Sequence, residues 1–114
     1  MDKYKKLKEI RDNIKKKTYR DSLVGDGDDL IKCMEYILTV TYKTGVPEEK
    51  ELEEVHDILF RICSRIFSLS IYRLRKKYWN KKDNAAFTRS FNKLCDVKGK
   101  YWRLYQKTDE YKNC

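Results

Sequence analysis

Apolar residues recur every three or four positions along most of the chain, the spacing of one face of an α-helix. The longest such run extends from Pro47 to Tyr78 and predicts one uninterrupted helix. Its main apolar positions are Leu52, Val55, Leu59, Ile62, Ile66 and Leu69. A second apolar stripe on the same helix comprises Phe60, Phe67, Ile71, Leu74 and Tyr78. A helix that is apolar on more than one side is expected to be wrapped by its neighbours, so this segment is predicted to be the central helix.

Three further runs with the same period predict three more helices. The first covers about residues 2–17, with apolar positions at Tyr4, Leu7, Ile10 and Ile14. The second covers about residues 29–43, with buried positions at Leu30, Met34, Ile37, Leu38 and Thr41. The fourth follows a break at residues 80–84, with apolar positions at Phe87, Phe91, Leu94, Val97, Tyr101 and Leu104. We therefore predict an all-α fold, a compact bundle of four main helices around a long central third helix, with residues 1–114 as one domain and a frayed tail after about residue 108.

The turn residues agree with these boundaries. Gly45 is expected to end the second helix in a left-handed conformation, and Pro47 to open the third, where its missing N–H is tolerated. Asp83 or Asn84 is a candidate cap for the fourth helix. Gly99 lies inside that helix and is expected to weaken it or split it.

Charge is segregated along the chain. Residues 1–20 contain nine Lys and Arg against three acids, residues 21–60 contain three against eleven, and residues 61–114 contain fifteen against four. The formal net charge is +9 over 114 residues. Such an excess favours a polyanionic partner. No run approaches the roughly twenty apolar residues of a membrane span, and no signal peptide is recognisable, so we expect a soluble cytoplasmic protein.

The end of the predicted third helix combines cations with aromatic rings. The candidate nucleic-acid-binding residues there are Arg73, Arg75, Lys76, Lys77, Tyr78, Trp79, Lys81 and Lys82. Their cations would neutralise phosphates, and exposed rings stack on unpaired bases at about 1 to 3 kcal/mol per base. A second basic group on the first helix, judged the weaker candidate, comprises Lys3, Lys5, Lys6, Lys8, Lys15, Lys16 and Lys17. Two other interpretations stay open, a merely solvated basic face and a docking surface for an acidic protein.

Motifs that carry chemistry are scarce. The sequence contains no glycine-rich phosphate loop and no recognisable nucleophile with a partnered base, so we predict a non-enzymatic protein without cofactor or metal. Glu53 and His56 form a single E-x-x-H step, whereas di-iron bundles need two such steps and further carboxylates. We interpret His56 as a solvated histidine. Cys33, Cys63 and Cys95 lie in apolar helical runs, where reduced thiols act as small hydrophobic residues.

Three segments resemble the helical domain of archaeal GINS subunits, YKKLKEIRDNIKKK, RDSLVGDGDDLIKCMEYI and EEKELEEVHDILFRICSRIFSLSIYRLRKK. The shared features are a lysine-rich first helix, an acidic stretch before a helix that ends in a Tyr-Ile pair, and a long third helix, over about residues 3–77. The resemblance implies a scaffold subunit that joins sister subunits and couples to the replicative helicase in DNA replication. A protein-interaction role without nucleic-acid contact is therefore the alternative function. It includes self-association, for which we expect an exposed apolar strip on the long helix.

Overall fold

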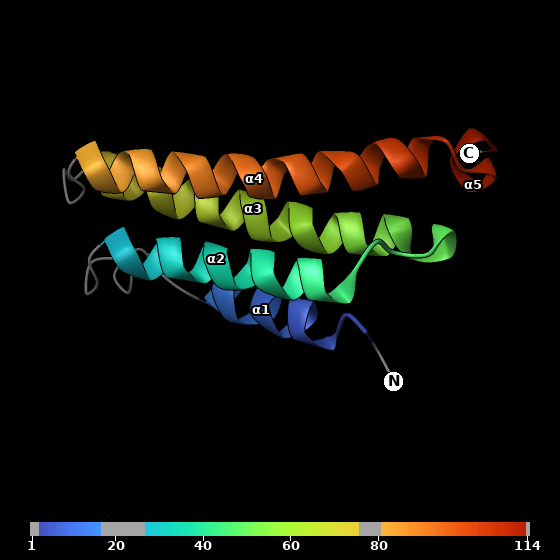
Figure 1. The fold of residues 1–114 in the computed structure, drawn as a ribbon, viewed down its shortest axis with the longest axis horizontal. Coiled ribbons are helices and arrows are strands. Elements are labelled where there is room, and N and C mark those ends of the chain that lie inside the picture. Colours follow the sequence, from blue (N-terminus) through green and yellow to red (C-terminus); the bar gives the residue numbers. More distant parts are fainter. Residues whose placement is uncertain (1–2, 17–26, 76–80, 114) are drawn as a thin grey trace.

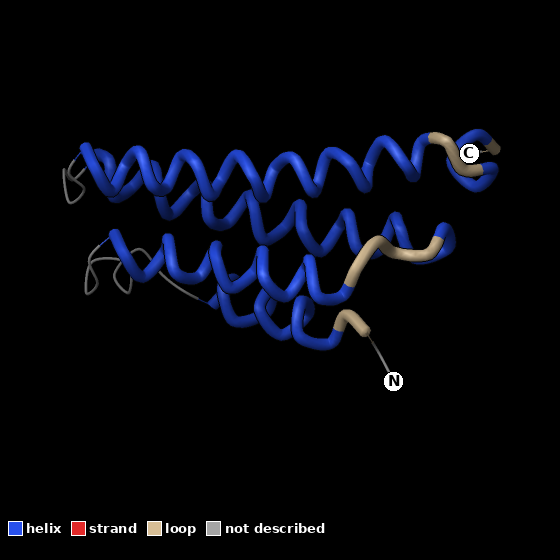
Figure 2. Tube along the Cα trace, viewed as in Figure 1, coloured by secondary structure: helices blue, strands red, loops and turns tan. Residues whose placement is uncertain are grey.

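The computed structural model describes residues 3–16, 27–75 and 81–113, and Figure 1 shows them as an elongated bundle. The long helices are α1 (Lys5–Lys16), α2 (Gly27–Thr44), α3 (Leu52–Arg75) and α4 (Lys81–Gln106). Two short elements complete the fold, the 3-10 turn η2 (Glu49–Glu51) and the single-turn helix α5 (Asp109–Lys112). Figure 2 shows helices and loops and no strand among these residues. The all-α prediction is confirmed.

Consecutive long helices run in opposite directions along a body of 46 × 26 × 25 Å (Figure 1). α3 packs against α1 and α4, and α2 packs against α4 and α1. The four helices therefore form a ring around a shared core, and α3 is one member of that ring. None of these helices, as far as the structure describes them, is long and apolar enough to cross a membrane.

The core side of α3 is the one that the main apolar run predicted. Its six predicted positions are all buried: Leu52, Val55, Leu59, Ile62, Ile66 and Leu69. Opposite them lie core residues of the other helices, among them Leu7, Met34, Ile37 and Leu94. Full burial of one such side chain contributes about 1.5 to 3 kcal/mol, so this interior is the main source of stability.

The second apolar stripe was predicted to be wrapped, and this is wrong for Phe60 and Phe67. Ile71 is half-buried, and the Leu74 side chain and Tyr78 lie outside the described residues. Phe60 and Phe67 are 50% and 51% exposed. The Phe67 ring stacks on Phe91 of α4 at 6.1 Å between centroids, and Lys98 Nζ of α4 lies 5.4 Å from the centroid of the Phe60 ring. Because a helix in a ring of four touches only two neighbours closely, it keeps one solvent-facing side, and these two phenylalanines lie there.

The start of the predicted long helix also differs. Gly45 has a φ of +81° as expected for its capping position. After it the chain is still extended at Glu48, with φ −66° and ψ 156°, and it passes through η2 before α3 begins at Leu52. Pro47 is therefore buried in the connection and does not open the helix.

At the other end of the fold, α4 begins at Lys81, so Asp83 and Asn84 lie in its first turn and do not precede it as caps. α4 then continues through Gly99 without a break. The tail was predicted to fray, but Thr108 accepts a hydrogen bond from the Tyr111 N–H at 3.2 Å and caps α5.

Candidate nucleic-acid interface

The predicted basic end is partly visible in the structure. Arg73 and Arg75 belong to the last turn of α3, and Lys81 and Lys82 to the first turn of α4. Those two turns lie at the same end of the bundle in Figure 1, and Lys81 and Lys82 are exposed. Outside the described residues lie the side chains of Arg73 and Arg75 and all of Lys76, Lys77, Tyr78 and Trp79. Four of the eight predicted residues are thus placed, and two have a described side chain.

The structure extends this basic end along the whole of α4. Exposed cations follow one another at helical spacing on the side of α4 that faces solvent. We call these residues, together with Lys107, which directly follows α4, the α4 stripe: Lys82, Arg89, Lys93, Lys100, Arg103 and Lys107. The exposed positions that fall among them on the same side are Ala85 and the single acid Asp96. At 1.5 Å per residue the stripe is about 38 Å long.

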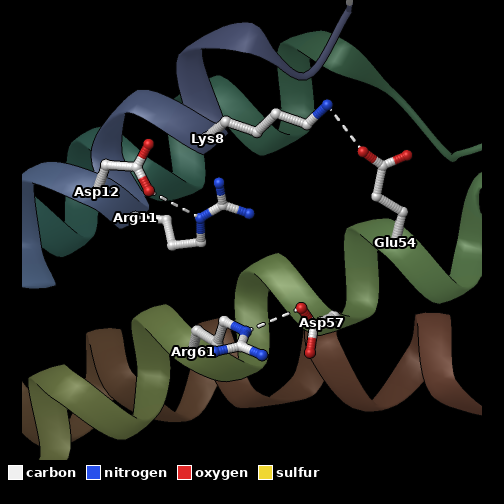
Figure 3. Close-up of polar contacts among 6 residues, drawn as sticks. All are labelled: Lys8, Arg11, Asp12, Glu54, Asp57 and Arg61. Atoms are coloured by element: carbon white, nitrogen blue, oxygen red, sulfur yellow. Dashed lines mark hydrogen bonds and ion pairs between the residues drawn. The ribbon is translucent and has the colours of Figure 1, made fainter.

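The charges of the α4 stripe face water. Of the residues that the structure describes, none forms an ion pair with a member of the stripe. The ion pairs shown in Figure 3 involve α1 and α3, and a further pair joins Lys50 and Glu48 just before α3. Among these pairs, Lys8 binds Glu54 at 2.8 Å, and Arg61 binds Asp57 at 2.9 Å. The field over α4 is therefore positive, with Asp96 on the same side offsetting one of the six positive charges.

Sequence reasoning missed this stripe although its signal is present in the sequence. Positions 82, 85, 89, 93, 96, 100, 103 and 107 repeat at intervals of three and four, and six of them are basic. The predicted break at residues 80–84 separated Lys82 from the cations that follow it. Once α4 starts at Lys81, the two groups become one surface.

An exposed ring lies on α2, which packs against α4. Tyr42, near the end of α2, is 62% exposed. It lies close enough to the buried Tyr101 of α4 to help raise the pKa of Tyr101, after the larger effect of burial. Tyr101 follows Lys100 in sequence, but Tyr101 is buried and Lys100 is exposed. The other α4 rings are packed, since Tyr101 and Tyr105 are each 4% exposed.

A smaller basic surface lies between α1 and α2. Lys3, Lys6 and Lys43 line a groove of about 380 Å³, together with the exposed ring of Tyr36. Among the residues that the structure describes, those that line this groove include no carboxylate. This groove has three cations, whereas the α4 stripe has six.

His56 was interpreted as solvated, and this is wrong. Its ring packs on Trp102 with 4.7 Å between centroids. Burial, and then the positive charge of Lys98, lower the pKa of His56 below its usual 6.5. The histidine is therefore a neutral packing residue of the α3–α4 contact at physiological pH. Among the described residues no three His, Cys, Asp or Glu side chains come together in a geometry that could hold a metal ion.

The cysteines of the described region are free thiols. Cys63 is buried, and Cys33 and Cys95 are half-buried. Burial raises the pKa of Cys63 to about 12, and the neighbouring Cys95, to which it is hydrogen-bonded, adds to the rise. Cys63 therefore packs as a protonated, weakly nucleophilic group between α3 and α4.

No family model, curated protein or solved structure matches this chain. The resemblance of residues 3–77 to the helical domain of GINS subunits therefore stays a prediction, and the functional argument rests on the surface of the chain itself.

Proposed function

We propose that this protein binds nucleic acid without sequence preference through the α4 stripe and the basic end that continues it. The observation that carries the proposal is the row of six exposed cations, five on α4 and Lys107 directly after it, with one acid, Asp96, among them. At the 3.4 Å that separates neighbouring charges of one DNA strand, about 38 Å of helix runs beside about 11 nucleotides. No catalytic step is part of this function.

Two details of α4 support an anionic ligand. Lys81 and Lys82 stand in the first turn, where the positive end of the helix dipole disfavours cations by a few tenths of a kcal/mol or more. A phosphate bound there would interact favourably with both the lysines and the helix end. Tyr42, on the neighbouring helix α2, adds an exposed ring on which an unpaired base could stack.

The test is binding of labelled single-stranded and duplex oligonucleotides of about twenty nucleotides, nearly twice the length of the stripe at the strand spacing used above. The stripe variant Arg89→Glu/Lys93→Glu/Lys100→Glu should lose most of the affinity of the wild-type protein. The matched control Lys3→Glu/Lys5→Glu/Lys6→Glu reverses three exposed lysines of the N-terminal segment and α1, and should retain most of it. Equal losses in the two variants would mean that only net charge matters and would refute the assignment to α4.

An acidic protein could also meet a basic stripe, and a competitor distinguishes this alternative. Polyglutamate offers carboxylates at similar density but no phosphates and no bases. We expect it to displace a bound oligonucleotide only at much higher charge concentration. Displacement at equal charge concentration would favour the acidic-protein interpretation.

A further inference from the structure

The outer face of α3 has the pattern of a helix-packing surface, and the described chain covers it only in part. We define this face by Phe60, Ser64, Phe67 and Ile71, whose spacing of four, three and four is that of a coiled-coil seam. The two phenylalanines are half-exposed, Ser64 is exposed and Ile71 is half-buried. A large apolar side chain left half in water forgoes part of the roughly 1.5 to 3 kcal/mol that full burial provides.

A groove of about 670 Å³ lies beside this face, between α1 and α3. Its lining residues include Ile14 of α1 and Phe60, Ser64 and Ser68 of α3. Figure 3 shows Arg11 and Arg61 on its facing sides, each bonded to an aspartate of its own helix, Asp12 and Asp57. Arg65 also lines the groove, so its walls carry three arginines and two aspartates, together with small serines and the apolar surface of Ile14 and Phe60.

Charge along α3 indicates what covers the face. Residues 48–57 contain six acids and one lysine, whereas residues 58–75 contain four arginines and no acid. A second α3 aligned in the same direction would place like charges together, and an α3 aligned in the opposite direction would place acids beside arginines. We propose that two copies of this chain pair through the outer faces of α3, antiparallel, about a two-fold axis close to Ser64.

This arrangement is self-complementary, as a two-fold interface must be. With Ser64 at the axis, position 67 of one copy comes opposite position 61 of the other, so Phe67 meets the mouth of the partner groove. The small Ser64 lets the helices approach closely at their crossing. Position 53 of one copy comes opposite position 75 of the other, so an acidic position, Glu53, faces a basic position, Arg75, at each end of the contact.

The oligomeric state in solution tests whether a second copy of the chain covers the outer face of α3. Sedimentation equilibrium of the wild-type chain from low to high micromolar concentration should show a monomer–dimer equilibrium. Phe60→Ser/Phe67→Ser should be a monomer with unchanged circular dichroism, while the control Tyr36→Ser/Tyr42→Ser, which removes two rings of at least equal exposure, should still dimerise. A wild-type chain that stays monomeric throughout, or a phenylalanine variant that dimerises like the wild type, would overturn the proposal.

Disulfide trapping tests the direction of the helices. In a chain with the four native cysteines replaced by Ala or Ser and a native circular dichroism spectrum, Ser64→Cys should form a symmetric disulfide under mild oxidation. Glu53→Cys alone should not, but should cross-link to Arg75→Cys when the two chains are mixed. Symmetric cross-linking of Glu53→Cys would show a parallel pair and overturn the antiparallel geometry.

Discussion

The salt dependence of binding gives a number for the α4 stripe. Each phosphate that a cation neutralises releases counterions and contributes about −0.9 to the slope of log K against log salt for duplex DNA, and about −0.7 for single strands. If all six stripe residues each contact one phosphate, the slope is about −5.4 for duplex and about −4.2 for single strands. Between about 50 and 200 mM salt, the duplex affinity then falls roughly 2,000-fold.

The perturbation is the neutral variant Arg89→Gln/Lys93→Gln/Lys100→Gln, which removes half of the stripe. Its duplex slope should decrease in size by about 2.7, to about −2.7, and its affinity should fall only about 40-fold over the same salt range. Glutamine keeps side chains of similar length on an exposed face, so the free energy of unfolding should hardly change.

Fluorescence anisotropy titrations at four or more salt concentrations measure the slope directly. The control Lys3→Gln/Lys5→Gln/Lys6→Gln has the same net charge as the stripe variant and should keep a slope close to that of the wild type. A stripe variant whose slope changes by less than about 1 would refute the assignment, because it would show that those three side chains release almost no counterions.

Three further predictions concern the α3–α4 half of the bundle. Gly99→Ala should raise the free energy of unfolding by up to about 1 kcal/mol in a urea melt, since α4 is helical there and the new Cβ would lie 3.3 Å from the movable Arg103 Nη1; a loss would show that the arginine cannot yield. Burial lowers the pKa of His56 below 6.5 in the folded protein, so on acidification the histidine of the unfolded chain is protonated first. The free energy of unfolding should therefore decline as the pH falls from about 7 through 6.5 and below. His56→Gln should lack this component of the decline in urea melts at several pH values, and an identical pH profile would contradict it. Cys63, with its pKa near 12, should resist iodoacetamide at about pH 8 in the native protein and react in urea, as followed by mass spectrometry; equal rates in both states would contradict its burial.

The helices were predictable because their signals are local and redundant. The six core positions of α3 repeat at helical spacing, and every one of them is buried. Gly45 was recognised as a left-handed cap because a glycine between an apolar run and a proline has few other roles. In these places propensity, periodicity and turn chemistry agree, so one sequence window was enough.

The errors arose where tertiary contacts decide. Whether Phe60 faces a neighbour or water depends on how many helices surround α3, and periodicity does not contain that number. His56 stands in an acidic segment of the sequence, but its ring packs on Trp102, which lies far along the chain. The α4 stripe was missed for a different reason, because the start of α4 was placed a few residues too late.

The α4 stripe and the side of α4 that contacts α3 are different sides of the same helix. Nucleic-acid binding and dimerisation can therefore be tested separately. The side of α4 that meets α3 carries Phe91, Lys98 and Trp102, which contact Phe67, Phe60 and His56 respectively. The stripe residues fall on the opposite side of the same helix.

Pairing through α3 would therefore leave one uncovered stripe on each copy, facing away from the contact. A nucleic-acid strand bound to one stripe gains no affinity from the stripe of the second copy unless it is long enough to reach both. The Phe60→Ser/Phe67→Ser variant should accordingly keep the wild-type salt slope on an oligonucleotide of about twenty nucleotides, while losing affinity on longer polymers that can engage both stripes. Conversely, the stripe variants should keep the wild-type association in sedimentation. If the phenylalanine variant lost the salt slope on the short oligonucleotide, nucleic-acid binding would require the dimer, and the site could not be one helix face alone.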